Sequence, residues 1–334
     1  MDHQRRCLRI GGAVIAGAVI LRLLSAGTLN PLWQALTRPE TVAVLMYLET
    51  GRVVRNYSGI TYPAESPIPE FTKPAPAQPS PPVFSAEAAD CIQVDYECGY
   101  APDLGTLLTM PLSWDLTGDE PTVLILHSHA TESYTKTEDY QESASYRTLS
   151  TDHNMVSIGA EIAAILEEKG IKVIHDTTLY DYPSYNSSYI NAREGAAELL
   201  EKYPSVKLVL DLHRDGADSS LKQPRYTVDT PTGTAAQVML VVGTDAGGRN
   251  HPDWEKNMAL AVKLHTRLEQ NTPGICRPIS LRSDRFNQDL SSGAMIIEMG
   301  AAGNTRQEAL AAAAYVAQGI IDLAKGCVTE DFAT

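Results

Sequence analysis

Three apolar stretches of this 334-residue sequence end in side chains that could bind a metal ion or move a proton. PTVLILHSH ends in His127 and His129, VKLVLDLH ends in His213, and GAMIIEMG carries Glu298. Short apolar runs of this kind predict buried strands. Because sites in open α/β sheets form outside the carboxyl ends of the strands, we expect these side chains to meet in one place.

His129 and Glu132 form an HxxE spacing directly after the first predicted strand. Residues three apart on a loop or in a first helical turn can point to the same side, so both could reach one metal ion. His213 would supply a third ligand. Two imidazoles and a carboxylate leave the fourth position of a tetrahedral zinc ion to water, which is the catalytic form of such a site. The spacing therefore predicts a zinc site.

Hydrolysis at such a site also needs a carboxylate that moves a proton without binding the metal. Glu298 fits this role, because a carboxylate in an apolar strand costs free energy unless it has a function or a partner. Zinc would lower the pKa of bound water toward about 7 and polarise an amide carbonyl. The alternatives are a core histidine for His213 and a salt-bridged strand end for Glu298. His127 is an alternative ligand, or it supports a ligand or the substrate.

Several other polar residues lie near these motifs. Arg193, Arg214 and Asp215 could bind substrate carboxylates or form ion pairs, and residues 287–289 could line a groove. Four clustered tyrosines could pack on sugar faces, but a loop that covers the site is the preferred prediction: Tyr180, Tyr182, Tyr185 and Tyr189. The remaining histidines carry weaker signals; we expect His175 inside a strand and His153, His251 and His265 toward the surface. The sequence has no P-loop, dinucleotide fingerprint or GxSxG elbow.

Strands and helices alternate from about residue 90 to residue 325. Helical spacing covers 154–169, 190–203, 253–270 and 305–325, with Asp152 as the expected N-cap of the first helix. Strands are expected at 121–127, 171–176, 206–213, 237–243 and 293–300. This alternation predicts an α/β fold whose twisted sheet is mostly parallel and has helices on both faces.

The N-terminus predicts a membrane segment. Arg5, Arg6 and Arg9 precede an apolar run from Ile10 to Leu21, and no small-residue cleavage site follows it. Twelve apolar residues are short for a span, but snorkelling of Arg22 would allow residues 8–29 to cross. An uncleaved signal anchor is favoured over a cleaved signal or a buried helix. The basic residues would then stay in the cytoplasm and the rest of the chain outside it.

Composition divides the chain into four predicted parts. A signal anchor (1–30) and a juxtamembrane segment (31–62) precede a proline-rich linker (63–88) and a catalytic zinc hydrolase domain (89–326). Eight of the 20 residues from 63 to 82 are proline, which predicts an extended spacer. The expected location is therefore the cell membrane, with one crossing and the catalytic domain on the extracytoplasmic side.

The charge balance excludes some functions. Lys and Arg number 27 against 41 Asp and Glu, so the formal net charge is −14. General nucleic-acid binding needs a basic surface, and so does electrostatic attraction to anionic lipid or wall polymer. Any anionic substrate must therefore be held by a local site. Among the five cysteines, Cys91 and Cys98 could form a short disulfide or remain unpaired.

Five motifs, in this order, closely resemble stage II sporulation protein P of endospore-forming bacteria: HSHATESY, VIHDTTLYDYPSYNSSY, LDLHRDG, RFNQDLS and IIEMGAAGNT. The resemblance covers about residues 90–325. It implies a membrane-anchored peptidoglycan hydrolase with Zn²⁺ as cofactor. The implied activity is that of an N-acetylmuramoyl-L-alanine amidase with additional endopeptidase activity. It further implies a role in engulfment during sporulation, together with stage II sporulation proteins D and M.

Wider resemblances concern single positions. Glu298, Gly300 and Asn304 keep the spacing that follows the catalytic Glu in zinc amidases, and Asn304 becomes a candidate substrate-binding residue with Arg193 and Arg214. His129 and Glu132 resemble the first two ligands of zinc carboxypeptidases. The amidases take their Glu ligand from the start of the next helix, where this sequence has no Glu. Glu132 is therefore preferred, with Asp152 and His153 as alternatives.

The implied reaction is cleavage of the amide between N-acetylmuramic acid and the L-Ala of the stem peptide. Two other functions stay open on the sequence alone. A zinc peptidase that cuts only peptide bonds would use the same four residues. A peptidoglycan-binding module without activity would keep the fold, but it would be expected to have lost a ligand or the base.

Overall fold

The computed structural model describes residues 84–112, 114–216 and 223–327. The predicted signal anchor, the juxtamembrane segment and most of the linker lie outside these residues, so those predictions stay open. Among the described residues, no helix combines the length and apolar character needed to cross a membrane. Phe84 is buried in the core and a 3-10 helix, η1 (Ala86–Cys91), begins two residues later. The folded part therefore includes residues just ahead of position 89.

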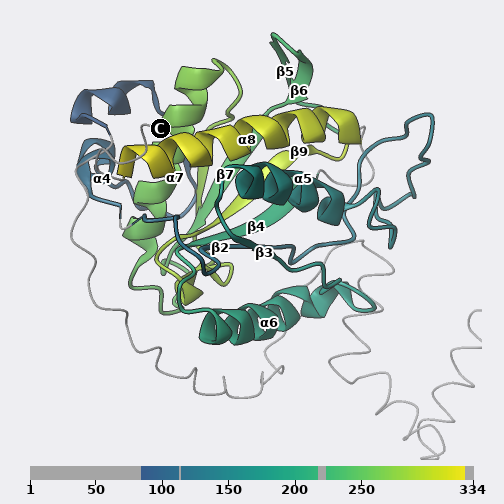
Figure 1. Cartoon of the computed structure of the whole chain (residues 1–334), viewed down its shortest axis with the longest axis horizontal. Helices are drawn as coiled ribbons and strands as arrows, with labels where there is room; N and C mark the ends of the chain where they lie inside the picture. The colour runs from purple at the N-terminus through teal and green to yellow at the C-terminus, as the bar shows by residue number, and fades with distance from the viewer. Residues whose placement is uncertain (1–83, 113, 217–222, 328–334) are drawn as a thin grey trace, which may run out of the picture. The chain divides into compact units, whose positions relative to one another are not determined.

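A seven-stranded sheet forms the centre of the fold, in the order β1-β8-β7-β9-β4-β2-β3 (Figure 1). Its strands are β1 (Val94–Tyr96), β2 (Val123–Leu126), β3 (Val173–His175), β4 (Leu208–Asp215), β7 (Val238–Gly243), β8 (Ile279–Arg282) and β9 (Ala294–Ala301). All neighbours are parallel except β7 and β9, which are antiparallel. The mostly parallel α/β sheet predicted from the sequence is confirmed.

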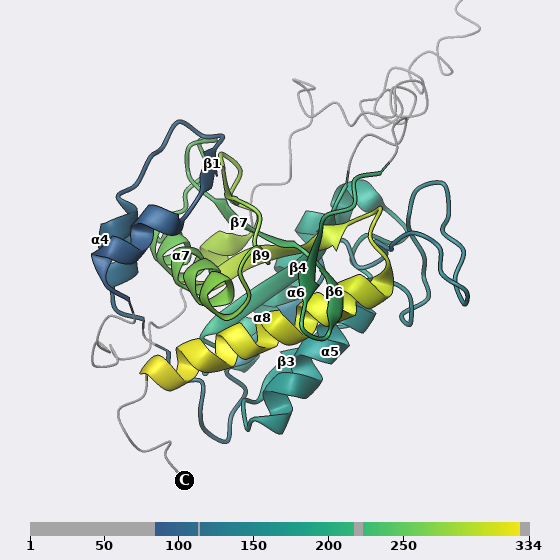
Figure 2. The same ribbon diagram turned by 90° about the horizontal axis from the view of Figure 1, so that it is seen from above.

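Helices cover both faces of the sheet (Figures 1 and 2). On one face, α5 (Met155–Glu168), α7 (Trp254–Asn271) and α8 (Arg306–Cys327) share the larger apolar core with α4 (Leu104–Thr109). On the other face, α6 (Ser188–Lys202) packs its alanines against β2 and β4 in a smaller core. Both faces are buried, and this explains why β2 and β4 read as continuous apolar runs.

The boundaries of α5 differ from the prediction at one end. Asn154, and not Asp152, is the N-cap: its side chain accepts a 3.0 Å hydrogen bond from the Val156 amide. Asp152 is exposed and lies before the cap. At the other end Gly170, with φ of +82°, follows the last turn as expected, because a left-handed residue there suits glycine.

Some elements carried no clear sequence signal. These are α4, η1, strand β8 and a separate hairpin of β5 (Thr227–Thr230) and β6 (Gly233–Ala236).

The prediction that His251 and His265 lie at the surface is wrong, since both are buried. Helix α7 contacts both α4 and α8, so more than one of its sides is covered. The Cys98 thiol is free, and the short Cys91–Cys98 disulfide is therefore not formed.

The register of the central strands fixes where the chemistry can occur. Strands β2, β4 and β9 run in one direction, so their carboxyl ends share one edge of the sheet. In this register Leu126 pairs with Asp211, and His213 pairs with Glu298. Paired residues on adjacent strands project to the same face, which brings the predicted ligand and the predicted base together.

We predict that Gly293→Ala destabilises the fold by roughly 1–3 kcal/mol, the cost typical of overpacking. A Cβ at Gly293 would stand 2.0 Å from the backbone oxygen of Lys207, just before β4, so the β4–β9 pairing would have to shift. Chemical denaturation measures the effect. Gly105→Ala in α4 is the control, because its nearest contact would be the Ala86 side chain at 3.3 Å. Equal stabilities of the two variants would contradict the prediction.

Candidate active site

Glu298 and His213 form the centre of the candidate site. Glu298 is partly exposed as a residue, but its Oε2 atom is buried and has no hydrogen-bond partner among the described residues. Burial raises the pKa of Glu298 to about 8, and the nearby Glu132 carboxylate adds to this, whereas the His213 charge opposes it. A carboxyl group with a pKa near neutrality can both take up and return a proton.

His129 lies against His213, as the sequence predicted. It stands in the turn after β2, and its ring meets the His213 ring edge-on, with the centroids 5.1 Å apart. Tyr185 stacks on His129 at 4.3 Å, and the Arg147 guanidinium covers the Tyr185 ring at 3.6 Å. Tyr189 meets the His129 ring edge-on, with the centroids 5.2 Å apart, and lies nearly parallel to the His213 ring at 6.2 Å. Of the four clustered tyrosines, Tyr185 and Tyr189 therefore lie against His129, whereas Tyr180 packs in the smaller apolar core and Tyr182 is exposed.

Glu132 completes the predicted set. Its Oε2 atom lies 3.8 Å from His213 Nδ1 and accepts a hydrogen bond of 3.2 Å from the Arg214 amide. The side chain is buried together with His129 and His213. His153, an alternative to Glu132, instead contacts Ser150 and the Tyr140 ring. Asp152 is exposed. The geometry thus favours Glu132 over both alternatives.

His127 belongs to the opposite face of the sheet. Its Nε2 atom lies 3.0 Å from His175 Nε2, and its Nδ1 atom lies 3.3 Å from the Leu212 carbonyl. The ring packs so closely on α5 that a Cβ at Gly159 would stand 2.7 Å from it. Burial lowers the pKa of His127 to about 3, so the ring is neutral. This placement favours His129 as the ligand and gives His127 a contact with the backbone that carries His213.

Asp211 is a site residue that the sequence reasoning did not single out. Its Oδ1 atom lies 2.9 Å from His213 Nε2, and both side chains are buried. Burial disfavours a charged His213, but the Asp211 carboxylate outweighs it and raises the pKa of His213 to about 10. The available signal was the D-x-H spacing, because residues two apart on a strand share a face.

The three candidate substrate-binding residues use their polar atoms within the protein. Arg193 makes two 2.8 Å hydrogen bonds to Asp289, and Arg214 donates to the carbonyls of Ser133 and Tyr146 at 3.0 Å. Asn304 is buried and bridges the turn after β9 to Tyr226. These contacts favour the ion-pair and loop-holding alternatives for these side chains.

The Glu298–Gly300–Asn304 spacing has a conformational cause. Gly300 has a φ of +74°, and a Cβ there would stand 2.8 Å from Ala236 Cβ and 2.9 Å from Asn304 Oδ1. Glycine is therefore required two residues after Glu298. The Asn304 side chain in turn accepts a 2.9 Å hydrogen bond from the Ala301 amide and fixes the exit of β9.

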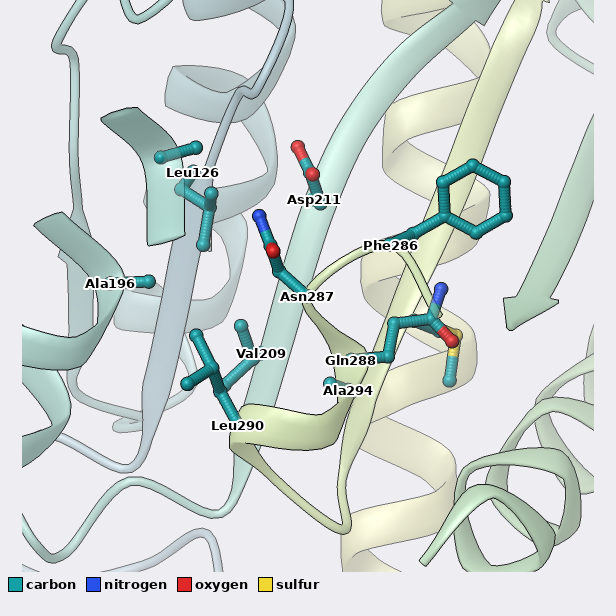
Figure 3. Close-up of a pocket in the computed structure, with 11 residues that line it drawn as sticks. Leu126, Ala196, Val209, Asp211, Phe286, Asn287, Gln288, Leu290 and Ala294 are labelled. Carbon is teal, nitrogen blue, oxygen red and sulfur yellow. The ribbon is translucent and has the colours of Figure 1, made fainter. Parts of the chain in front are cut away.

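A small cavity of about 20 Å³ lies on the α6 face beside Asp211 (Figure 3). Apolar side chains make up most of its wall, with Asp211, Asn287 and Gln288 as polar members. Asn287 has a left-handed φ of +61° and donates to the Tyr189 carbonyl at 2.7 Å. Of the three residues expected to line a groove, Asn287 and Gln288 line this cavity, whereas Asp289 pairs with Arg193.

The donor types at the site suit zinc, which binds imidazole nitrogen and carboxylate oxygen. Within residues 84–327, apart from the gaps, no three His, Cys, Asp or Glu side chains are already arranged to hold a metal ion. However, donors on a tetrahedral ion stand about 3.3 Å apart for bonds of about 2.0–2.1 Å. The 3.8 Å between His213 Nδ1 and Glu132 Oε2 is close to this separation. Zinc at this site stays a prediction.

The model of the stage II sporulation protein P (SpoIIP) family matches residues 72–321 of this chain. The chain belongs to the SpoIIP family. Stage II sporulation protein P of Bacillus subtilis (strain 168) is 27% identical over 207 residues, which are 58% of this chain and 48% of that protein. The chain therefore spans about half the length of this SpoIIP relative.

Solved structures give more distant matches to this SpoIIP family member. N-acetylmuramoyl-L-alanine amidase AmiC2 of Nostoc punctiforme matches 62% of this chain and 99% of its own, with 15% identity and a TM-score of 0.39. An N-acetylmuramoyl-L-alanine amidase of Clostridium difficile 630 matches 62% and 98%, with 14% identity and a TM-score of 0.37. These scores are too low to support a functional conclusion.

We predict that Arg193 and Asp289 are energetically coupled by roughly 2 kcal/mol in a double-mutant cycle with alanine, measured by denaturation. Charged hydrogen bonds with little solvent exposure reach this size. The control pair is Lys256 and Asp253, whose side chains are about half exposed and should couple by less than about 0.5 kcal/mol. A coupling near zero for Arg193 and Asp289 would leave Arg193 available for substrate.

We also predict that Glu298→Gln stabilises the metal-free protein at alkaline pH. The raised pKa means that the folded state holds the Glu298 proton more tightly than the unfolded chain. Ionisation therefore lowers stability as the pH rises from about 4.5 to about 8. At about 1.4 kcal/mol per pKa unit, the difference at pH 9 is roughly 2–5 kcal/mol and shrinks toward pH 5.

Thermal melts of the wild type and Glu298→Gln at several pH values test this expectation. Glu201→Gln is the matched control, because it makes the same change at an exposed position of α6 and should show no such trend. A stability difference that does not vary with pH would show that Glu298 is not held at a raised pKa.

Proposed function

We propose that this protein is a zinc-dependent peptidoglycan hydrolase that cleaves the amide between N-acetylmuramic acid and the L-Ala of the stem peptide. The observation that carries the proposal is the register of β4 and β9, which pairs His213 with the buried carboxylate of Glu298 beside His129 and Glu132. Membership of the SpoIIP family supports it. Cleavage of stem-peptide cross-links is a second activity open to the same residues.

His129, Glu132 and His213 would hold the zinc ion. When bound, zinc supplies a Lewis acid that polarises the amide carbonyl and makes water more acidic. The surrounding residues keep these ligands in place. Arg214 holds Glu132 through its backbone amide, and Tyr185 packs on the His129 ring. Rigid support of this kind fixes the reacting groups before the substrate arrives.

Glu298 moves the proton. Its buried Oε2 atom is free to accept a proton from the attacking water, because no described residue donates a hydrogen bond to it. The same carboxyl group can then return a proton to the nitrogen of the departing L-Ala. Both steps need a carboxyl group that can gain and lose a proton within reach of the reacting atoms.

The cellular setting is part of the proposal. The basic and apolar N-terminal sequence would anchor the chain in the cell membrane, and the proline-rich linker would hold the enzyme away from it. The substrate then lies on the extracytoplasmic side, in the wall remodelled during engulfment. Stage II sporulation proteins D and M are the proposed partners. With a net charge of −14, binding to an anionic wall polymer would depend on the site itself.

The test incubates the full chain with purified peptidoglycan and zinc, and mass spectrometry identifies the released fragments. We expect free stem peptides and peptide-free glycans from the wild type. Loss of about a thousandfold or more is expected for Glu298→Gln, while Glu201→Gln should keep its activity. Chelation of zinc should abolish release.

Each other outcome points to a different function. Shortened or uncrosslinked peptides that stay attached to muramic acid would mean a peptidase. No release from any substrate, with normal binding to peptidoglycan, would mean a binding module. Full activity of Glu298→Gln, or of the chelated protein, would refute the zinc mechanism.

A further inference from the structure

The Asp211 carboxylate connects two parts of the site that are far apart in the sequence. It projects from β4 on the same face as His213 and lies 2.9 Å from His213 Nε2. It also accepts two hydrogen bonds from Ser128, from the amide at 2.7 Å and from the hydroxyl at 2.6 Å. Ser128 immediately precedes His129, so one carboxylate contacts a proposed ligand and the loop that carries the other two.

Asp211 would be costly to bury without such contacts. Its side chain is almost fully covered, and beside it the cavity of Figure 3 is walled mainly by apolar groups such as Leu126 and Val209. A buried carboxylate is tolerated when hydrogen bonds and a positive or proton-donating partner compensate for lost hydration. Ser128 and His213 supply both. This places the carboxylate behind His213 and away from the Glu132 side of the ring.

The two nitrogens of His213 therefore have different surroundings. Nε2 faces Asp211 Oδ1, and Nδ1 faces Glu132 Oε2 at 3.8 Å. In the neutral imidazole that binds a metal, a carboxylate beside one ring nitrogen keeps the proton on that nitrogen and leaves the lone pair on the other. Histidines that bind metals commonly donate their second N–H group to a carboxylate in this way.

We propose that Asp211 is a positioning residue. It holds His213 with the proton on Nε2, so that zinc binds through Nδ1, and it fixes the His129 and Glu132 loop through Ser128. This inference rests on the proposed function, because it assumes that His213 binds zinc. It adds a specific tautomer and a residue that orders the ligands before the metal arrives.

Asp181 provides a matched control. It is buried and accepts hydrogen bonds from the amide and hydroxyl of Thr131 on the same loop, as Asp211 does from Ser128. No contact with His213 is recorded for Asp181 in the described part of the chain. Asn in place of Asp keeps the shape and an oxygen acceptor at either position. At position 211, however, the new amide can donate to Nε2 and so favours the wrong tautomer of His213.

The experiment measures the zinc affinity of the full chain by competition with a chromogenic chelator. We expect Asp211→Asn to bind zinc 10–100-fold more weakly than the wild type, the usual effect of losing a carboxylate behind a ligating histidine. Asp181→Asn should stay within about threefold. Equal affinity of Asp211→Asn and the wild type, or equal losses in both variants, would overturn the proposal.

Nitrogen NMR of ¹⁵N-histidine-labelled, zinc-loaded wild type tests the tautomer without any change at Asp211, and so remains decisive if Asp211→Asn does not fold. We expect His213 to keep its proton on Nε2. A zinc-bound Nε2 would overturn the inference while leaving the proposed function intact. If the wild type binds no zinc, the affinities of the variants cannot be compared with it. That result would refute both the proposed function and this inference.

Discussion

The pairing of β4 with β9 is the interaction on which the rest of the site depends. Parallel pairing in one register sets His213 opposite Glu298, and a slip of one residue would turn either side chain to the other face of the sheet. Backbone contact at Gly293 and the left-handed Gly300 hold the two ends of β9. Two short hydrogen bonds from Ser128 to Asp211 then join the loop after β2 to β4 and bring His129 and Glu132 to the same edge.

Electrostatics inside the site are dominated by carboxylates. Glu132, Asp211 and Glu298 surround His213, and Arg214 is the adjacent cation, about 3.8 Å from Glu132. The environments of Asp211 and Glu298 shift the pKa values of these two carboxyl groups in opposite directions. Asp211 is hydrogen-bonded and has a lowered pKa despite its burial, whereas Glu298, whose Oε2 atom has no hydrogen-bond partner in the described part of the chain, has a raised pKa. Two carboxyl groups on neighbouring strands are thereby prepared for different tasks, one to remain charged and one to exchange a proton.

The sequence predicted the parts of the fold that rest on long periodic patterns. The central strands and the four long helices were recognisable because elements buried on one or both faces have apolar residues at regular positions in the sequence. Strand β8 (ISLR) and the hairpin strands β5 (TVDT) and β6 (GTAA) mix polar and small residues, so they lack the continuous apolar run that identified β2 and β4. His265 was misplaced because its burial depends on residues outside α7, such as Arg277, whose backbone bonds to the His265 ring. At the site, His213 and Glu298 could be predicted because they lie near the ends of apolar strands. Asp211 lies within such a strand and was not singled out from the sequence. Its contact with Ser128 joins residues 83 positions apart, and no local pattern reports such a contact.

The single antiparallel junction between β7 and β9 divides the sheet into two groups of opposite polarity. The strands β2, β3, β4 and β9 direct their carboxyl ends to the edge where the chemistry occurs, and β1, β7 and β8 direct theirs to the opposite edge. The segment that leaves β8 nevertheless returns to the site, because Phe286 lies against the Tyr189 ring and Asn287 donates a hydrogen bond to the Tyr189 carbonyl. Strands of both polarities therefore contribute to the surroundings of the site, and a change in the segment after β8 can reach His129 and His213 through Tyr189.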